Sequence, residues 1–259
     1  MKKNKLNKTI VIPFSNERLD NLEQMLRFLS KEEMALKSEI ILVCQTIYIG
    51  KPKKFQFFRI INLRSNIYCR AKMCNIGVEK STSEIIILLD SDRILPNDYF
   101  TKVCSEIEEN QCVTTQNHWQ LTHDVTDDDI YNEKYNSIYQ PKCTKNKMHK
   151  KGSFSGNTVL FKEAYDFAGG MDESYEGYGY QDIDFSRTMI QKGMNMIFRQ
   201  EKELHLYHQK TLNAKKNTIE NGIKYCQKWN FYPSLELIKN GKSIGIDVLK
   251  KTNKEIKYL

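Results

Sequence analysis

Two aspartates separated by a single residue, Asp90 and Asp92, are the clearest chemical feature of the chain. They follow residues 85–89, an unbroken run of Ile and Leu that is short for a helix and fits a strand buried on both faces of an α/β sheet. Ligands of open α/β sheets bind beyond the carboxyl ends of the strands, so both carboxylates are expected to reach a binding site there. Two such carboxylates repel each other unless a cation joins them, which indicates Mg²⁺ or Mn²⁺ together with substrate phosphates.

The same residues also fit a less specific role at the start of a helix. Ser91 or Asp92 would then be the N-cap ahead of the segment Pro96-Asn97-Asp98. The motif taken alone does not choose between a metal site and a helix cap.

The elements before this motif alternate between strands and helices. Strands are predicted at residues 9–13, 40–43 and 57–63, and helices after the polar loop 14–18 and over residues 70–80. In the first helix Leu19, Leu22, Met25, Leu26 and Leu29 recur at the helical period, and Ser15 or Asn16 is the expected N-cap. The alternation predicts an α/β fold built on a Rossmann-like, mainly parallel, doubly wound sheet. Neither G-x-G-x-x-G nor G-x-x-x-x-G-K-[ST] occurs, so the two best-known phosphate loops are absent.

The elements after the motif are less regular. We predict a short helix opening at residue 127, a strand at 153–162, a helix from 181 to about 192, a strand pair around 196–198 and 204–208, and C-terminal helices. Residues 142–151 form a basic loop with five Lys and no acidic residue. Residues 169–180 form a Gly- and Tyr-rich loop, a kind of segment that commonly carries function.

Composition narrows the class of protein. The 259 residues, 40% of them hydrophobic, suffice for one large α/β domain or a domain with an appended lobe. The formal charge of +8 suits phosphorylated ligands, anionic lipid or nucleic acid, and does not choose among them. Seven Cys without a C-x-x-C pair favour free thiols in a reducing compartment, and no apolar segment is long enough to span a membrane. A cytoplasmic protein is therefore expected.

Six segments carry a resemblance because of their order along the chain. They are 12–16 (Ile-Pro-Phe-Ser-Asn), 70–77 (Arg-Ala-Lys-Met-Cys-Asn-Ile-Gly), 89–92 (Leu-Asp-Ser-Asp), 169–173 (Gly-Gly-Met-Asp-Glu), 177–184 (Gly-Tyr-Gly-Tyr-Gln-Asp-Ile-Asp) and His208. In this order they resemble GT-A glycosyltransferases, in particular β-1,4-galactosyltransferases and bacterial chondroitin-polymerase domains, over residues 10–208. The resemblance implies a GT-A fold and metal-dependent, inverting transfer from a UDP-sugar.

The resemblance also implies a metal and nucleotide site. Asp92 becomes a metal ligand, Asp90 a ribose or metal contact, and His208 a further ligand, and an imidazole suits Mn²⁺ better than Mg²⁺. In isolation His208 would more often be a surface or core histidine, but its place after the D-x-D favours a ligand. For His205 the ordinary role is the prediction. The residues expected to border the nucleotide are Pro13, Phe14, Arg70 and Ser91.

Asp182 is the candidate general base. An acceptor hydroxyl must lose a proton as it attacks the anomeric carbon, and a carboxylate within hydrogen-bond reach suffices when a metal stabilises the leaving diphosphate. Asp182 would equally suit a helix N-terminus, and the two roles are compatible. Asp184 competes for the role of base, but residues two apart on a helix lie on different faces, and the family pattern selects Asp182.

Acceptor contacts are assigned to Tyr178, Gly179 and Gln181. The tyrosines of this loop could form a sugar-stacking wall or ordinary packing, and its glycines could simply make a turn. The family commonly has Trp in place of Tyr178 and Glu in place of Gln181, and galactosyltransferases carry Arg in place of Ser15. These departures leave the donor sugar and the acceptor open.

We predict one catalytic domain over residues 1–234, with a nucleotide-binding half at about 8–110 and an acceptor half at about 111–212. Residues 235–259 form a basic helical tail with six lysines. The tail could lie on an anionic membrane, although ordinary helix packing is the simpler expectation.

The expected activity is transfer from a UDP-sugar to a carbohydrate hydroxyl, in bacterial surface-polysaccharide or lipid-linked glycan synthesis. It would take place in the cytoplasm or at the inner face of the membrane. A nucleotidyltransferase would use the same carboxylate pair and metal, but it has no need for the loop 177–184. A basic nucleic-acid-binding module would interleave aromatic and basic residues, whereas the Lys clusters here are aromatic-poor, so no nucleic-acid partner is expected.

Overall fold

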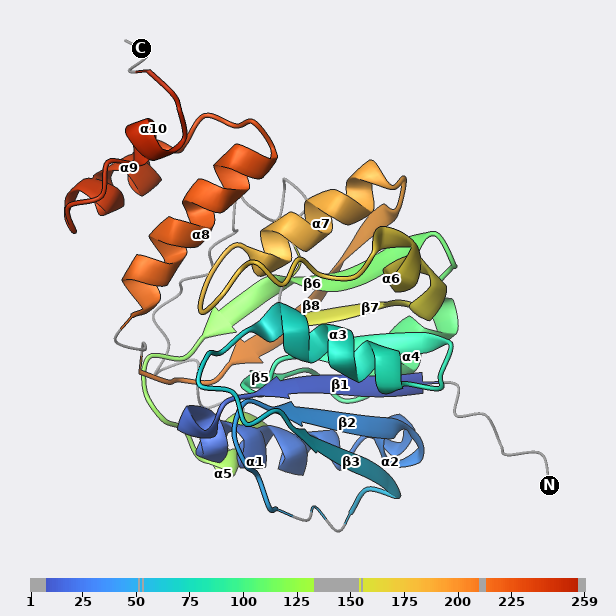
Figure 1. Ribbon diagram of the computed structural model, residues 1–259. Coiled ribbons are helices and arrows are strands. Elements are labelled where there is room, and N and C mark those ends of the chain that lie inside the picture. Colours follow the sequence, from blue (N-terminus) through green and yellow to red (C-terminus); the bar gives the residue numbers. More distant parts are fainter. Residues whose placement is uncertain are drawn as a thin grey trace.

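The computed structural model describes residues 8–50, 52, 54–132, 154, 156–209 and 213–255. Within these residues eight strands form one sheet in the order β3-β2-β1-β4-β7-β6-β8-β5 (Figure 1). The strands are β1 (Lys8–Phe14), β2 (Glu39–Cys44), β3 (Phe57–Asn62), β4 (Ile85–Leu89), β5 (Arg93–Ile94), β6 (Gln111–Gln120), β7 (Asn157–Phe161) and β8 (Asn195–His205). The helices are η1 (Asn16–Arg18), α1 (Leu19–Leu29), α2 (Glu33–Lys37), α3 (Arg70–Lys80), α4 (Tyr99–Glu106), α5 (Asp127–Tyr131), α6 (Lys162–Ala168), α7 (Gln181–Gln191), α8 (Ala214–Lys228), α9 (Leu235–Lys242) and α10 (Val248–Lys251).

The sheet has a parallel half and a mixed half. β3, β2, β1 and β4 run parallel to one another. β7 is antiparallel to both β4 and β6, while β6 and β8 are parallel and β5 runs against β8. The predicted mainly parallel α/β sheet is therefore confirmed, with its antiparallel pairs in the second half of the chain.

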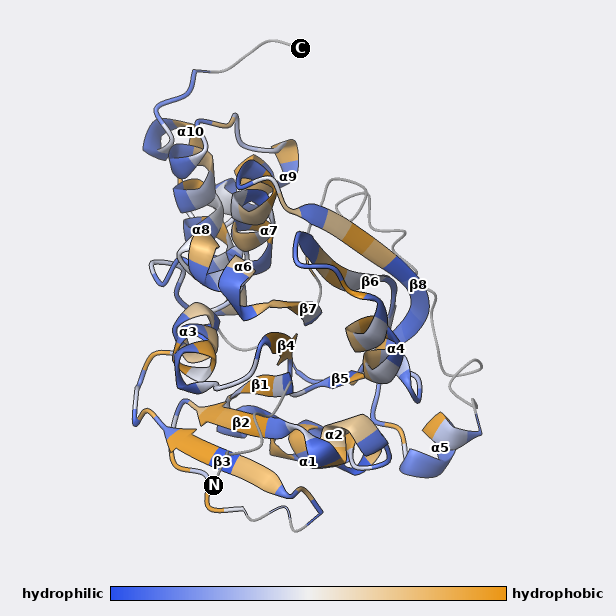
Figure 2. Ribbon diagram, turned by 90° about the vertical axis from the view of Figure 1, so that its right-hand side faces the viewer, coloured by the Kyte–Doolittle hydropathy of each residue, from blue (hydrophilic) through white to orange (hydrophobic). Residues whose placement is uncertain are grey.

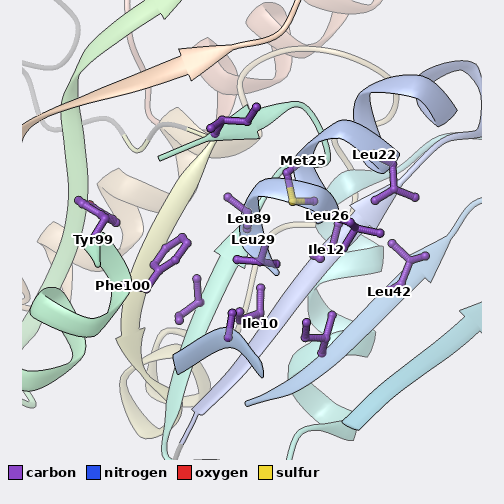
Figure 3. Close-up of a cluster of buried hydrophobic side chains, with 14 of the residues drawn as sticks. Ile10, Ile12, Leu22, Met25, Leu26, Leu29, Leu42, Leu89, Tyr99 and Phe100 are labelled. Carbon is purple, nitrogen blue, oxygen red and sulfur yellow. The ribbon is translucent and has the colours of Figure 1, made fainter. Parts of the chain in front are cut away.

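Helices cover both faces of the parallel half because the strand residues alternate between two cores. Ile10, Ile12 and Leu42 join α1 in one hydrophobic cluster, where Leu22, Met25, Leu26 and Leu29 face the sheet as their spacing predicts (Figure 3). Val11 instead joins α3 in a second cluster on the other face. There Gly77 lets the helix approach closely, since a Cβ at this position would lie 2.3 Å from a Val11 methyl carbon. Figure 2 shows the resulting concentration of apolar residues in the central strands.

One prediction for the second half was wrong, and one strand was not predicted. The strand pair around 196–198 and 204–208 is one continuous strand, β8, which ends at His205. β6 was missed because its sequence, Gln-Cys-Val-Thr-Thr-Gln-Asn-His-Trp-Gln, has no clear apolar alternation. Its pairing with β8 also shifts register between Thr115 and Asn117, which marks a bulge.

The D-x-D segment lies in a turn rather than at the start of a helix. β4 ends at Leu89, and β5 begins one residue after Asp92. The next helix, α4, starts only at Tyr99 and has Asp98 as its N-cap. The helix-cap alternative for Ser91 and Asp92 is therefore wrong, and both residues stand at the carboxyl end of a buried strand.

The C-terminal helices pack on one another beside α7 (Figure 1). Residues of α8, α9 and α10 form a small core of their own: Ile219, Ile223, Cys226, Leu237 and Val248. The described part of the tail is thus packed on α8, in agreement with the expectation of ordinary helix packing. None of the described helices combines the length and the apolar composition needed to cross a bilayer.

Candidate functional site

The carboxyl ends of β4 and β8 meet next to the D-x-D turn. Arg93 of β5 pairs with His205 of β8, and the Leu206 N–H donates to the Asp92 carbonyl at 2.9 Å. These backbone contacts join the two strand ends although they are more than a hundred residues apart in the chain. The side chains of Asp92 and His205 are thereby brought to one place.

Asp92, His205 and His208 form a three-ligand cluster. The Nε2 atoms of both imidazoles lie 3.4 Å from Asp92 Oδ2 and 3.1 Å from each other. One ligand atom from each residue fits within a 4.8 Å span. The prediction for His208 agrees with this placement, whereas the ordinary role assigned to His205 does not. β8 ends at His205 and the chain then turns, which brings His205 and His208 to the same carboxylate.

The protonation chemistry of the cluster suits a divalent cation. Burial lowers the pKa of both His205 and His208, so both imidazoles are neutral near pH 7 and each has a lone pair to give. The Nδ1 of His208 lies 3.0 Å from the Gln209 carbonyl and can donate to it, which leaves Nε2 as the ligating atom. Asp92 is 1% exposed, and its Oδ1 has no hydrogen bond from any described residue. One carboxylate and two imidazoles fit Mn²⁺ better than Mg²⁺.

Two arginines and the contact with His205 keep the Asp92 carboxyl ionised in spite of its burial. Burial alone would raise its pKa, but the contact with His205 and the charges of Arg18 and Arg93 hold the pKa well below the ordinary value. Arg18 donates to Oδ2 in a short contact, and Arg93 Nε lies 3.3 Å from Oδ1. The ionised carboxylate can serve as an oxygen ligand of a divalent cation.

Arg70 joins Asp90 to Asp182. From the first turn of α3, its Nε donates to Asp90 Oδ1 at 2.6 Å and its NH1 donates to Asp182 Oδ1 at 2.8 Å. Asp90 therefore faces Arg70 and stands outside the three-ligand cluster. Burial raises the pKa of Asp182 to about 6, against the opposing charge of Arg70 and with the help of the negative charge of Asp90. A carboxylate with this pKa can accept a proton near neutral pH.

Asp184 points the other way, into the contact between α7 and α8. It is 1% exposed and accepts hydrogen bonds from Tyr175 Oη at 3.0 Å, Lys228 Nζ at 2.8 Å and Trp229 Nε1 at 2.7 Å. All of these partners are structural side chains away from the D-x-D turn. The expectation that only one of the two α7 aspartates faces the site agrees with this geometry.

Hydrogen bonds from α8 hold the loop that precedes α7. Asn221 of α8 donates to the carbonyls of Glu176, Tyr178 and Gly179 at 2.8, 3.2 and 3.0 Å. Gln181 donates to the Gly177 carbonyl at 2.7 Å, so its amide braces the loop. Gly179 has φ of +99°, a conformation that favours glycine in this turn.

Only one of the three loop tyrosines presents its ring to solvent. Tyr178 is 56% exposed, which suits an acceptor surface. Tyr175 is 1% exposed, and Tyr180 packs against Tyr225 with ring centroids 5.4 Å apart. Packing thus accounts for Tyr175 and Tyr180, and the predicted stacking wall is reduced to Tyr178.

The residues expected to border the nucleotide lie at the same edge of the sheet, and all of them are buried. Pro13, Phe14 and Ser91 are buried at the ends of β1 and β4. Phe14 is 0% exposed, and its ring packs edge-on against Tyr48 at 5.5 Å. Phe14 is therefore a core side chain at the end of β1. The basic loop 142–151 lies outside the described residues.

Sequence reasoning missed a buried polar network behind the cluster. Glu203 is 0% exposed and receives Arg93 NH1 at 3.1 Å, with His118 Nδ1 3.2 Å away. Burial would raise its pKa, but His118 and Arg93 lower the pKa to about 2. The available signal was strand alternation, because Glu203 and His205 share one face of β8.

Fold and site together define the class: the chain has the GT-A glycosyltransferase fold. A family model described as the N-terminal domain of galactosyltransferase matches residues 139–210, so this segment is similar to galactosyltransferases. No curated protein sequence matches the chain.

Solved structures extend the likeness over nearly the whole chain. GalNAc-T7, solved with UDP, GalNAc and Mn²⁺, matches with a TM-score of 0.58 at 15% identity, over 98% of this chain and 57% of that one. The mannosyltransferase PcManGT from Pyrobaculum calidifontis, solved with GDP-Man and Mn²⁺, matches with a TM-score of 0.61 at 13% identity, over 97% of this chain and 73% of that one. The chain thus spans little more than half of the GalNAc-T7 chain, and at these identities the likeness establishes the fold.

Proposed function

We propose that this protein is a metal-dependent, inverting glycosyltransferase that moves a sugar from a nucleotide-sugar to a carbohydrate hydroxyl. The observation that carries the proposal is the joint placement of two chemical groups at one sheet edge. The Asp92–His205–His208 cluster can hold Mn²⁺, and Arg70 ties the neighbouring Asp90 to the Asp182 carboxylate. Two solved structures of the same fold, each bound to Mn²⁺ and to a nucleotide or nucleotide-sugar, support a metal-dependent reaction of a nucleotide-sugar.

The chain's own residues divide the work of the reaction. When bound by Asp92, His205 and His208, a divalent cation would offset the negative charge of the departing diphosphate. Asp182 takes the proton of the acceptor hydroxyl as that oxygen attacks the anomeric carbon from the side opposite the leaving group, which inverts the configuration. Arg70 holds Asp182 through Oδ1, and no described residue donates a hydrogen bond to Oδ2, which is the oxygen left for the proton.

The donor we favour is a UDP-sugar. The motifs resemble β-1,4-galactosyltransferases, and the matching family model is of galactosyltransferase type. The competing donor class is a GDP-sugar, because PcManGT was solved with GDP-Man. The donor sugar itself is left to experiment.

Turnover of a panel of donors tests both the donor class and the need for a metal. The protein is incubated with Mn²⁺ and one donor at a time: UDP-Gal, UDP-GalNAc, UDP-Glc, UDP-GlcNAc, UDP-GlcA or GDP-Man. The released nucleoside diphosphate is measured with and without EDTA. We expect slow Mn²⁺-dependent release from at least one UDP-sugar and none in EDTA. Release from GDP-Man alone would overturn the donor assignment, and undiminished release in EDTA would overturn the metal.

We further propose that the protein works in surface-polysaccharide or lipid-linked glycan synthesis, in the cytoplasm at the inner membrane face. Support comes from α9, where Leu235 is 63% exposed beside the exposed Lys239 and Lys242. An apolar side chain among lysines suits anionic lipid. Sedimentation with vesicles containing about 30% phosphatidylserine tests this, with Lys239→Glu/Lys242→Glu as the variant. Equal binding of the unaltered protein and the variant to the vesicles would refute the proposed membrane contact.

A further inference from the structure

Two arginines share the Asp92 carboxylate, one at each oxygen. Arg93 lies 3.3 Å from Oδ1 and is held at its other end by buried Glu203, 3.1 Å away. Arg18 donates to Oδ2 from the residue just before α1, and its side chain is 24% exposed. Among the described residues Asp92 is the one carboxylate that pairs with Arg18. Arg93 is therefore fixed between two acids, whereas Arg18 has a single anchor and access to solvent.

The anchor of Arg18 is also the oxygen that a metal needs. Asp92 Oδ2 is the carboxylate atom 3.4 Å from both His205 Nε2 and His208 Nε2. A cation bound by these three residues must take Oδ2. Asp92 is 1% exposed, so solvent does little to screen a guanidinium from a divalent cation at the same oxygen. Arg18 and the cation consequently compete for one ligand atom.

A displaced Arg18 remains beside the expected nucleotide. Arg18 follows β1, and the charges of Asp92 and Asp90 together with Tyr68 raise its pKa against the effect of burial. Asp90 and Arg70 stand at the same edge. A guanidinium binds phosphate oxygens through two parallel N–H donors, a geometry that ammonium lacks.

We infer that Arg18 is an exchangeable counter-cation. It neutralises Asp92 Oδ2 in the metal-free protein, yields that oxygen to the divalent cation, and then binds the diphosphate of the nucleotide-sugar. This inference rests on the proposed function for the metal and the diphosphate. It assigns to one side chain two effects of opposite sign: Arg18 weakens binding of the metal alone and strengthens binding of the nucleotide once the metal is present.

Arg18→Gln separates these effects. Titration of MnCl₂ without nucleotide, followed by the electron paramagnetic resonance of free Mn²⁺, should give a Kd about three- to tenfold lower than that of the unaltered protein, because the competitor is gone. Calorimetric titration of UDP at saturating Mn²⁺ should give a Kd about tenfold higher, the loss expected for one charge-assisted hydrogen bond. Arg18→Lys keeps the charge without the planar fork and should fall between the two proteins for both ligands.

Arg27→Gln is the matched control. Arg27 lies on α1 and pairs with Asp127 at 2.7 Å on the surface, away from Asp92. Its substitution by Gln removes the same positive charge as Arg18→Gln. It should leave the Kd values for Mn²⁺ and UDP unchanged. Equal changes of these Kd values in the Arg18 and Arg27 variants would mean that net charge alone causes them, and would overturn the inference.

Chemical labelling follows the exchange in the unaltered protein and does not depend on how a variant folds. Phenylglyoxal modifies exposed guanidinium groups, and digestion with mass spectrometry gives the rate at Arg18. We expect Mn²⁺ alone to raise that rate, and Mn²⁺ with UDP or with inorganic pyrophosphate to lower it below the metal-free value. A rate unchanged by Mn²⁺, or protection by uridine equal to that by pyrophosphate, would overturn the inference.

The proposed function and this inference fail in different ways. If the unaltered protein binds no Mn²⁺, or binds it equally after Asp92→Ala, the metal site itself is refuted and the inference falls with it. If Mn²⁺ binds through Asp92 with the same affinity in the unaltered protein and the Arg18→Gln variant, only the exchange is refuted.

Discussion

Two pairs of aspartates with the same spacing, Asp90 with Asp92 and Asp182 with Asp184, have different surroundings in this molecule. In the turn after β4 both carboxylates face the sheet edge, where Asp90 meets Arg70 and Asp92 meets two imidazoles. On α7 only Asp182 does so, while Asp184 is hydrogen-bonded to Lys228 and Trp229. Residues two apart on a helix are related by a rotation of about 200° about its axis and so point to nearly opposite sides, whereas a turn at a strand end imposes no such separation. The same D-x-D spacing therefore supplies two site groups in one region and one in the other.

The largest expected effect is at the turn. Asp92→Ala removes the oxygen shared by both imidazoles, so Mn²⁺-dependent UDP binding should be lost and turnover should fall by more than about a thousandfold, several kcal/mol of transition-state stabilisation. Donor turnover and UDP calorimetry with Mn²⁺ measure this. Retention of either property would mean that the cluster is not the metal site.

On the helix, Asp182→Asn should lower kcat by roughly 100- to 10,000-fold, the usual contribution of a general base, while UDP and Mn²⁺ binding stay nearly unchanged. The amide keeps the shape of the side chain but takes no proton. Steady-state kinetics with a soluble acceptor, alongside nucleotide calorimetry, provide the comparison. Loss of donor binding in this variant would mean that Asp182 binds the nucleotide-sugar and is not the general base.

The pH profile should report on Asp182 as well. A base works only when deprotonated, so with a pKa of about 6 the value of kcat/KM at saturating Mn²⁺ should fall about tenfold per pH unit below that point and level off above it. The Asp182→Asn variant should lack this acidic limb over the range in which Mn²⁺ stays bound. An identical limb in both proteins would assign the titration to another group.

The smallest expected effect on turnover comes from Asp184→Asn. Its partners are structural, so kcat should change by no more than a few-fold, but the buried ionic hydrogen bonds from Lys228 and Trp229 weaken. The free energy of unfolding should drop by about 1–3 kcal/mol, as for other buried hydrogen-bonded charges. Urea denaturation measures the drop. A larger loss of kcat than in Asp182→Asn would reverse the comparison between the two helix aspartates.

Local patterns in the sequence were sufficient for much of the parallel half. The apolar run 85–89 is β4 as predicted, and the helix expected over 70–80 is α3 with the same bounds. The opening of α5 at Asp127 was also predicted, where Thr126 and Asp129 form a capping box. In each case neighbouring residues alone carry the signal: strand-length apolar runs, helical spacing and capping side chains.

The metal cluster needed the tertiary structure because its members come from distant parts of the chain. His205 joins Asp92 only because the Leu206 N–H bonds to the Asp92 carbonyl and ends the strand alternation there. Arg18 and Arg93 gave no motif at all, since ion pairing between distant side chains leaves no period in the sequence. β6 was hidden for a related reason: its polar side chains, such as Thr115, are buried against Glu203 of the neighbouring strand. Sequence by itself determined which residues could bind a metal or take a proton, and the meeting of β4, β8 and α7 decided which of them face one another.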